Sequence, residues 1–86
     1  MYQEKITVLF LLNSSRTNQK GVCPLHCRIT LFKERKQFST GLFVNPSYWE
    51  SKCQKVNIKE TNHKYINAQI ERIQVKIYNT ALVFQL

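Results

Sequence analysis

The chain has 86 residues, and 43% of them are hydrophobic, which indicates one small domain with a packed core and argues against a disordered segment. Its 13 lysines and arginines against 5 acidic residues give a formal charge of +8, so nucleic acid is favoured as a partner ahead of an anionic membrane. Two glycines and no aspartate leave no phosphate-cradling loop and no obvious pair of catalytic carboxylates, so we expect no enzymatic activity and no cofactor.

The first predicted element is a strand over about residues 5–12, a stretch rich in β-branched and aromatic residues. Both of its faces are apolar, and we therefore expect both to be covered. The polar run from Asn13 to Gly21 indicates a loop, which carries Arg16 and Lys20. No apolar run is long enough to span a membrane, and the start lacks the pattern of a secretory signal, so an intracellular protein is expected.

The second predicted strand covers about residues 25–32 and follows Pro24, whose missing N–H is tolerated at the start of a strand. Its inward positions are apolar, whereas its outward positions are mostly polar. The outward positions are His26, Arg28, Thr30 and Phe32. The bend that follows lies near Lys33-Glu34 and lacks the glycine or asparagine that a tight two-residue turn prefers, so its type stays open.

The third predicted strand covers about residues 36–44 and presents Gln37 and Ser39 on the same outward face. Gly41 interrupts this strand and predicts a bulge. After the bulge, Leu42 and Val44 are expected to return to the core side of the sheet.

The residues after the third strand predict helical structure. Asn45 and Pro46 are typical of a helix start, and we predict one helical turn over residues 46–50 that places Tyr48 and Trp49 against the core. Residues 51–60 are predicted as extended or loop. A long helix follows over about residues 62–82, because isoleucines spaced by four, three and four residues form one apolar stripe. The stripe consists of Ile66, Ile70, Ile73 and Ile77.

These elements predict a single α+β domain over residues 1–86, in which a three-stranded antiparallel sheet packs on one long C-terminal helix. The three cysteines are expected as free thiols. Cys23, His26 and Cys27 are not predicted to bind a metal, because the two cysteines lie far apart along an extended chain and a structural zinc site needs four ligands. Cys27 is predicted as a small core residue.

The helix can cover only one face of such a sheet, and the other face is where we expect function. Its residue types are those that read base edges in the major groove, and the cations at its ends suit phosphates. The predicted base contacts are Arg28, Thr30, Gln37, Ser39 and His26. The predicted phosphate contacts are Arg16, Lys20, Lys33, Arg35 and Lys36.

Three other interpretations remain open. Exposed strand faces are commonly polar, and Arg28 could pair with a glutamate across the sheet without any role in binding. The sheet face or an edge strand could instead dock a partner protein. A binder of RNA or single strands needs exposed aromatic side chains, and Phe32 alone makes a poor stacking platform.

Three stretches of the sequence resemble the N-terminal arm-type DNA-binding domain of tyrosine recombinases, the integrases of conjugative transposons and phages. The stretches are VLFLLNSSRTNQKGVCPLHCRIT, RKQFSTGLFVNPSYWE and NAQIERIQVKIY. The shared pattern has a basic loop ending in Gly21, Arg28-Ile29-Thr30 in a strand, Ser39-Thr40-Gly41, Asn45-Pro46 before Trp49, and Asn67 near the helix start. Lys33-Glu34 departs from it, because a glycine-containing bend is usual there.

The resemblance implies a sheet laid into the major groove of arm-type sites in double-stranded DNA. It also implies that the catalytic residues belong to the remaining domains of a recombinase, so that this chain has none and does not cleave DNA by itself. The implied setting is the bacterial cytoplasm, with the protein on the nucleoid when bound. Neither a membrane nor a small-molecule substrate is expected as a partner.

Overall fold

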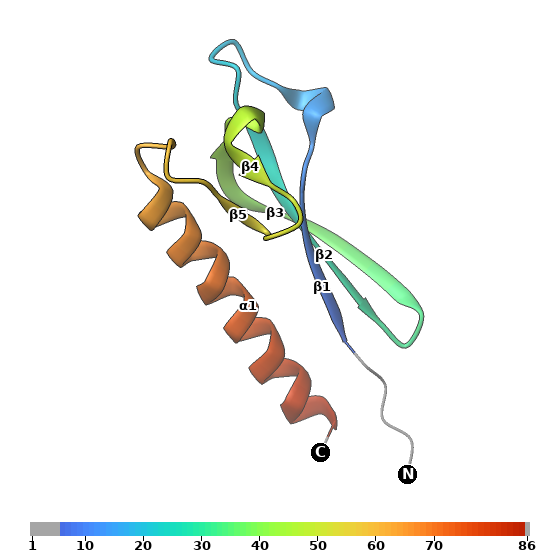
Figure 1. Cartoon of the computed structure of the whole chain (residues 1–86). Coiled ribbons are helices and arrows are strands. Elements are labelled where there is room, and N and C mark those ends of the chain that lie inside the picture. Colours follow the sequence, from blue (N-terminus) through green and yellow to red (C-terminus); the bar gives the residue numbers. More distant parts are fainter. Residues whose placement is uncertain (1–5, 86) are drawn as a thin grey trace.

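The frame of the molecule is a three-stranded antiparallel sheet and one long helix, in the computed structural model that describes residues 6–85 and the side chains of residues 6–80 (Figure 1). Strands β1 (Thr7–Leu12), β2 (Cys23–Leu31) and β3 (Glu34–Val44) lie in the order β1-β2-β3, and α1 spans His63–Gln85. The predicted α+β fold is thereby confirmed. Lys5, placed in the first strand by the sequence, lies outside the described residues.

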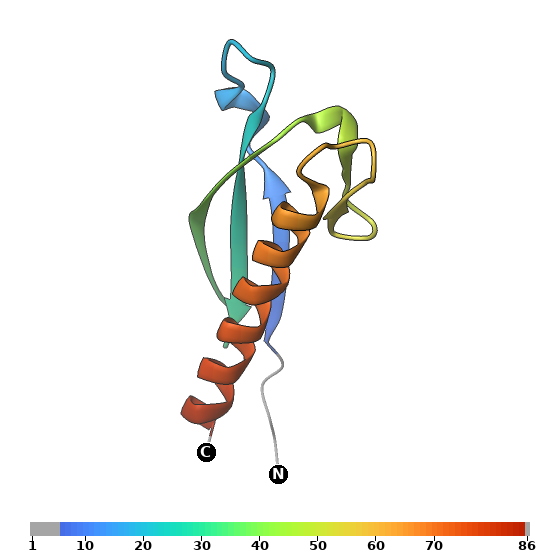
Figure 2. The ribbon, with the colours of Figure 1, turned by 90° about the vertical axis from the view of Figure 1, so that its left-hand side faces the viewer.

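Helix α1 lies across one face of the sheet, as the view from the helix side shows (Figure 2). The isoleucine stripe makes the contact: Ile66 and Ile70 are buried in the core, and Ile73 and Ile77 pack against it. The sheet contributes alternate residues of each strand, because successive side chains of a strand point to opposite faces. The buried core residues from the sheet are Phe10, Leu25, Cys27 and Val44.

Cys27 is fully buried, and burial raises the pKa of its thiol from 9.0 to about 11. The folded state therefore holds this proton more tightly than the unfolded state. We expect the part of the stability that depends on Cys27 to be complete below pH 9.0 and to be lost as the pH rises toward about 11. Urea unfolding at a series of alkaline pH values measures this decline.

Cys27→Ala is expected to flatten the alkaline decline, because the variant has no thiol to ionise. Cys53→Ala is the matched control, since Cys53 is exposed and its loss leaves the buried thiol in place. An equal decline in wild type and Cys27→Ala would show that other groups cause it.

A bulge in β3 returns the end of that strand to the core. His26 pairs with Ser39 but Pro24 pairs with Phe43, so three residues of β3 stand against Leu25 alone. Gly41 lies inside this bulge with φ +82°, a conformation that L side chains rarely adopt. As predicted, Leu42 and Val44 then face the core side.

The turn between β2 and β3 differs from the prediction. Its two residues are Phe32 and Lys33, and β3 begins at Glu34 rather than near residue 36. Both turn residues have positive φ, 53° and 65°, as a type I′ turn requires. Phe32 is therefore a turn residue with an exposed ring and not an outward residue of β2.

The pair Phe32→Asn and Lys33→Gly is expected to stabilise the domain by about 1 kcal/mol, because asparagine and glycine accept positive φ at lower cost. A thermal melt followed by circular dichroism should show a rise of several degrees. Phe43→Asn is the control, since this exposed phenylalanine lies in extended β3. A melting temperature unchanged by the paired substitution would show that the turn stores no strain.

A second, small sheet takes in the end of the predicted helical turn over residues 46–50 and part of the segment predicted as extended or loop, so the predicted turn was too long by two residues. After the 3-10 turn η2 (Pro46–Tyr48), strand β4 (Trp49–Glu50) pairs with β5 (Lys55–Val56). The expected placement of Tyr48 and Trp49 is confirmed, since both side chains pack against the core. Trp49 itself belongs to β4 and not to the helical turn.

Two side-chain amides attach this small sheet to the rest of the domain. Asn67 of α1 accepts from the N–H of Val56 at 2.8 Å and donates to its carbonyl at 2.9 Å. Gln54 accepts from the N–H of Phe10 in β1 at 2.6 Å and donates to its carbonyl at 3.0 Å. Because β1 is an edge strand, the Gln54 amide occupies backbone groups that an added strand would otherwise use.

Candidate nucleic-acid interface

The face of the main sheet opposite α1 is built from three cross-strand rows. Residues paired directly across an antiparallel sheet point to the same side, so each row crosses β1, β2 and β3 in turn. The rows are Thr7–Thr30–Arg35, Leu9–Arg28–Gln37 and Leu11–His26–Ser39. We call these nine residues the open face. All the predicted base contacts lie in it.

The part of the open face that lies on β1 was not predicted as part of the site. Its residues alternate with Val8, Phe10 and Leu12, which pack in the core. Both faces of this strand were expected to be covered, but Thr7 and Leu9 are exposed and Leu11 is half-buried. Leu9 is 40% exposed. The sequence of a strand with two apolar faces is the same whether the second face is buried or accessible. Only the number of layers in the fold shows that Leu9 of β1 is accessible.

A hydrogen-bonded chain crosses the centre of the open face. Arg28 Nε donates to Gln37 Oε1 at 3.3 Å, and Gln37 Nε2 lies 3.1 Å from His26 Nδ1. The residue across from Arg28 is therefore a glutamine and not a glutamate. None of the nine residues is acidic, so the alternative in which Arg28 forms an ion pair on this face is not supported.

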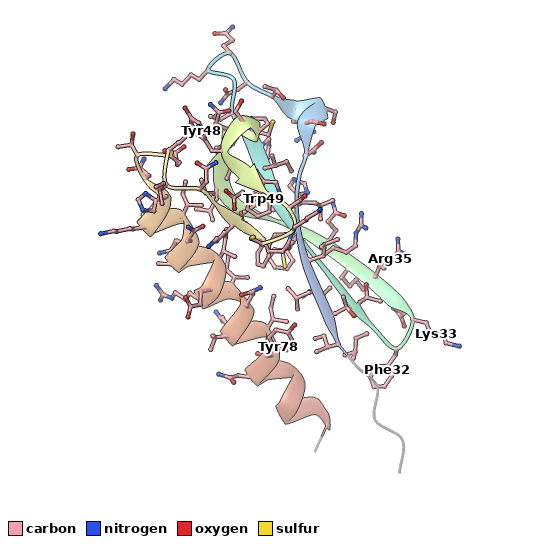
Figure 3. The ribbon with its side chains drawn as sticks, in the orientation of Figure 1. Phe32, Lys33, Arg35, Tyr48, Trp49 and Tyr78 are labelled. Atoms are coloured by element: carbon pink, nitrogen blue, oxygen red, sulfur yellow. The ribbon has the colours of Figure 1, made fainter. Side chains whose placement is uncertain are left out.

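Cations stand at both ends of the open face. Arg16 and Lys20 belong to the segment between β1 and β2, while Lys33 is in the turn at the other end of the β2–β3 hairpin (Figure 3). Arg35 extends from β3 on the side away from α1 (Figure 3). A local hydrogen-bonded turn shapes this loop, because the Asn18 side chain accepts from the N–H of Lys20 at 2.9 Å and from that of Val22 at 3.3 Å.

Lys36 does not join this group. It was expected at the bend, but β3 begins at Glu34, so Lys36 lies within the strand and faces one definite side. It pairs with Ile29, whose side chain packs against the core, and it therefore lies on the α1 side of the sheet. The expected position of Lys36 at the bend was thus wrong, and Lys36 lies on the opposite side of the sheet from Arg35.

A family model described as the arm DNA-binding domain matches residues 10–86. The chain belongs to that family. The match takes in β2, β3 and α1 whole and leaves residues 1–9 outside, including the first half of β1. No curated protein and no solved structure matches the chain. Arm DNA-binding domains are non-catalytic DNA-binding modules of integrase-type recombinases, which agrees with the resemblance seen in the sequence.

The cysteines of this arm DNA-binding domain do not form a further site with His26. Cys23 and Cys27 are buried in the domain, and His26 is on the opposite side of β2. Within residues 6–80, no group of three or more potential metal ligands comes together. The helix that the structure describes is not apolar enough to cross a membrane.

Proposed function

We propose that this arm DNA-binding domain lays its open face into the major groove of duplex DNA. The observation that carries the proposal is the arrangement of the face: a non-acidic surface with two arginines, bounded by cationic ends and backed by a core. A major groove about 12 Å wide admits a two-stranded ribbon, whose strands lie about 5 Å apart. The paired strands β2 and β3, which carry the polar residues of the open face, would therefore fit within it.

In this arrangement the residues divide into two roles. Arg28, Thr30, Ser39 and His26 would meet base edges, and Leu9 would offer the apolar contact that suits a thymine methyl group. The cations of the loop and the turn, together with Arg35 at the end row of the open face, would meet phosphates, which position the domain without reading sequence. The loop and turn cations are Arg16, Lys20 and Lys33.

We further propose that the domain is the N-terminal part of a tyrosine recombinase, an integrase of a conjugative transposon or phage, and that its duplex targets are arm-type sites. Cleavage and rejoining would then be carried out by the remaining domains. Arm-site binding would position the recombinase for integration and excision, on DNA in the bacterial cytoplasm.

Arg35→Ala and Lys36→Ala form a matched test of the face that meets DNA. The two exposed cations are neighbours in β3 but lie on opposite sides of the sheet, so both substitutions change the net charge equally. We expect Arg35→Ala to weaken binding to all duplexes and to lower the salt slope by about one unit. Lys36→Ala is expected to have a much smaller effect.

Fluorescence titration of a duplex at several salt concentrations measures both quantities. Equal effects of the two substitutions would contradict the assignment of the open face to DNA. Wild-type affinity that does not fall with salt would contradict a phosphate-anchored complex altogether and would favour docking of a partner protein.

A further inference from the structure

We propose that Gln37 is a positioning residue that holds Arg28 and His26 as a pair of hydrogen-bond donors, and that Arg28 thereby selects guanine while His26 selects a base with an acceptor in the major groove. The inference rests on the proposed function, because it names the base edges that the open face takes. Among the described residues, only Gln37 is hydrogen-bonded through its side chain to two other side chains of the open face.

The orientation of the Gln37 amide follows from the chemistry of arginine. A guanidinium has only donors, so the amide atom that faces Arg28 Nε must be the oxygen. The amide nitrogen then faces His26 Nδ1, 3.1 Å away. An amide nitrogen only donates, so Nδ1 must accept, and the proton of the neutral ring must sit on Nε2.

This chain leaves donors at both of its ends. Arg28 uses Nε toward Gln37, and no hydrogen bond within residues 6–80 uses its two terminal nitrogens. His26 presents the Nε2–H. Guanine exposes two acceptors in the major groove, O6 and N7, whereas adenine exposes one acceptor and one donor. The two terminal nitrogens of Arg28 therefore favour guanine, which has two acceptors. The single donor of His26 needs one acceptor, which guanine, adenine and thymine each have in the major groove and cytosine does not.

Gln37 would play a different role if its side chain were free. A free glutamine amide pairs with N6 and N7 of adenine and would read that base. Here both ends of the amide already bind protein side chains, so its orientation is set before DNA arrives. His26 and Arg28 are two residues apart on the same side of β2, about 7 Å by strand geometry, so they reach different base pairs.

Selection from a pool of randomised duplexes tests the inference with the whole chain. Wild type should enrich a site with guanine at the Arg28 position and a base other than cytosine at the His26 position. Replacement of that guanine, or cytosine at the His26 position, should weaken binding at least about fivefold. Gln37→Met keeps the length of the side chain but removes the amide. It should reduce both preferences to less than about twofold while binding a scrambled duplex as wild type does.

Comparison with Arg28→Ala separates positioning from reading. If Gln37 acts through Arg28, then Arg28→Ala with Gln37→Met should show no further loss at the Arg28 base pair beyond that of Arg28→Ala alone. Gln37→Glu retains an acceptor for Arg28 Nε and should keep the guanine preference there, even though its charge weakens binding to every duplex. Gln74→Met on α1 is the control and should preserve both preferences.

Two outcomes would overturn the inference and are distinguishable. If Gln37→Met lost preference at a third base pair, additively with Arg28→Ala, then Gln37 would itself be a reader, and the proposed function would stand. If wild type enriched no sequence and bound every duplex alike, then the proposal that the open face reads DNA would fail, and the inference with it.

Discussion

Trp49→Ala is expected to lower the free energy of unfolding by about 3 kcal/mol, the largest loss we predict for a residue that is not fully buried. The indole of Trp49 packs against the core cluster (Figure 3). In the small sheet, Trp49 pairs with the buried residue Val56, which is hydrogen-bonded to α1 through Asn67. Removal would leave a cavity where these parts meet. Domains of this size are stable by only about 5–15 kcal/mol, so much of the stability would be lost.

Urea unfolding of the variant measures this loss. Tyr65→Ala is the matched control, because this aromatic side chain lies on α1 and is 61% exposed, and we expect a change within about 0.5 kcal/mol. Trp49→Phe should retain most of the stability and all of the DNA binding, since Trp49 is not part of the open face. A Trp49→Ala protein as stable as wild type but unable to bind DNA would make the indole a contact residue instead.

Arg28→Ala is expected to cost about 1–3 kcal/mol on the preferred duplex and to remove the preference at one base pair. The arginine lies in the central strand, with Leu9 on one side and Gln37 on the other, so it stands over the middle of the proposed interface. The variant should stay folded, because the side chain is outside the core.

Titration of this variant against preferred and scrambled duplexes at two salt concentrations measures the effect. Arg72→Ala on α1 removes the same charge from an exposed position on the helix and is the control. We expect it to weaken binding slightly and equally for both duplexes. An Arg28→Ala variant that behaved in that way would be one more phosphate contact and not a reader of bases.

Local patterns were sufficient to predict the architecture. The isoleucine stripe repeats at the helical period, and the outward residues of β2 repeat at the strand period, so each pattern identifies both an element and its buried side. Gly41 predicted the bulge, because its conformation is open to glycine and to few other residues. The base-contact candidates could be named for the same reason: once β2 and β3 pair, alternation alone assigns Arg28 and Gln37 to one face.

The tertiary structure decided which residues of the site act together. The tight turn at Phe32 and Lys33 was not expected, because neither residue is a glycine or an asparagine. Owing to this turn β3 begins at Glu34, and Lys36 lies within the strand on the α1 side of the sheet. The Gln54 bond to Phe10 joins residues 44 positions apart, and no local pattern reports such a contact. The exposure of Leu9 and the bonds from Gln37 to Arg28 and His26 likewise depend on how many layers cover the sheet and on which side chains meet across strands. These are non-local properties, because they arise from packing between segments that the sequence pattern describes only one at a time.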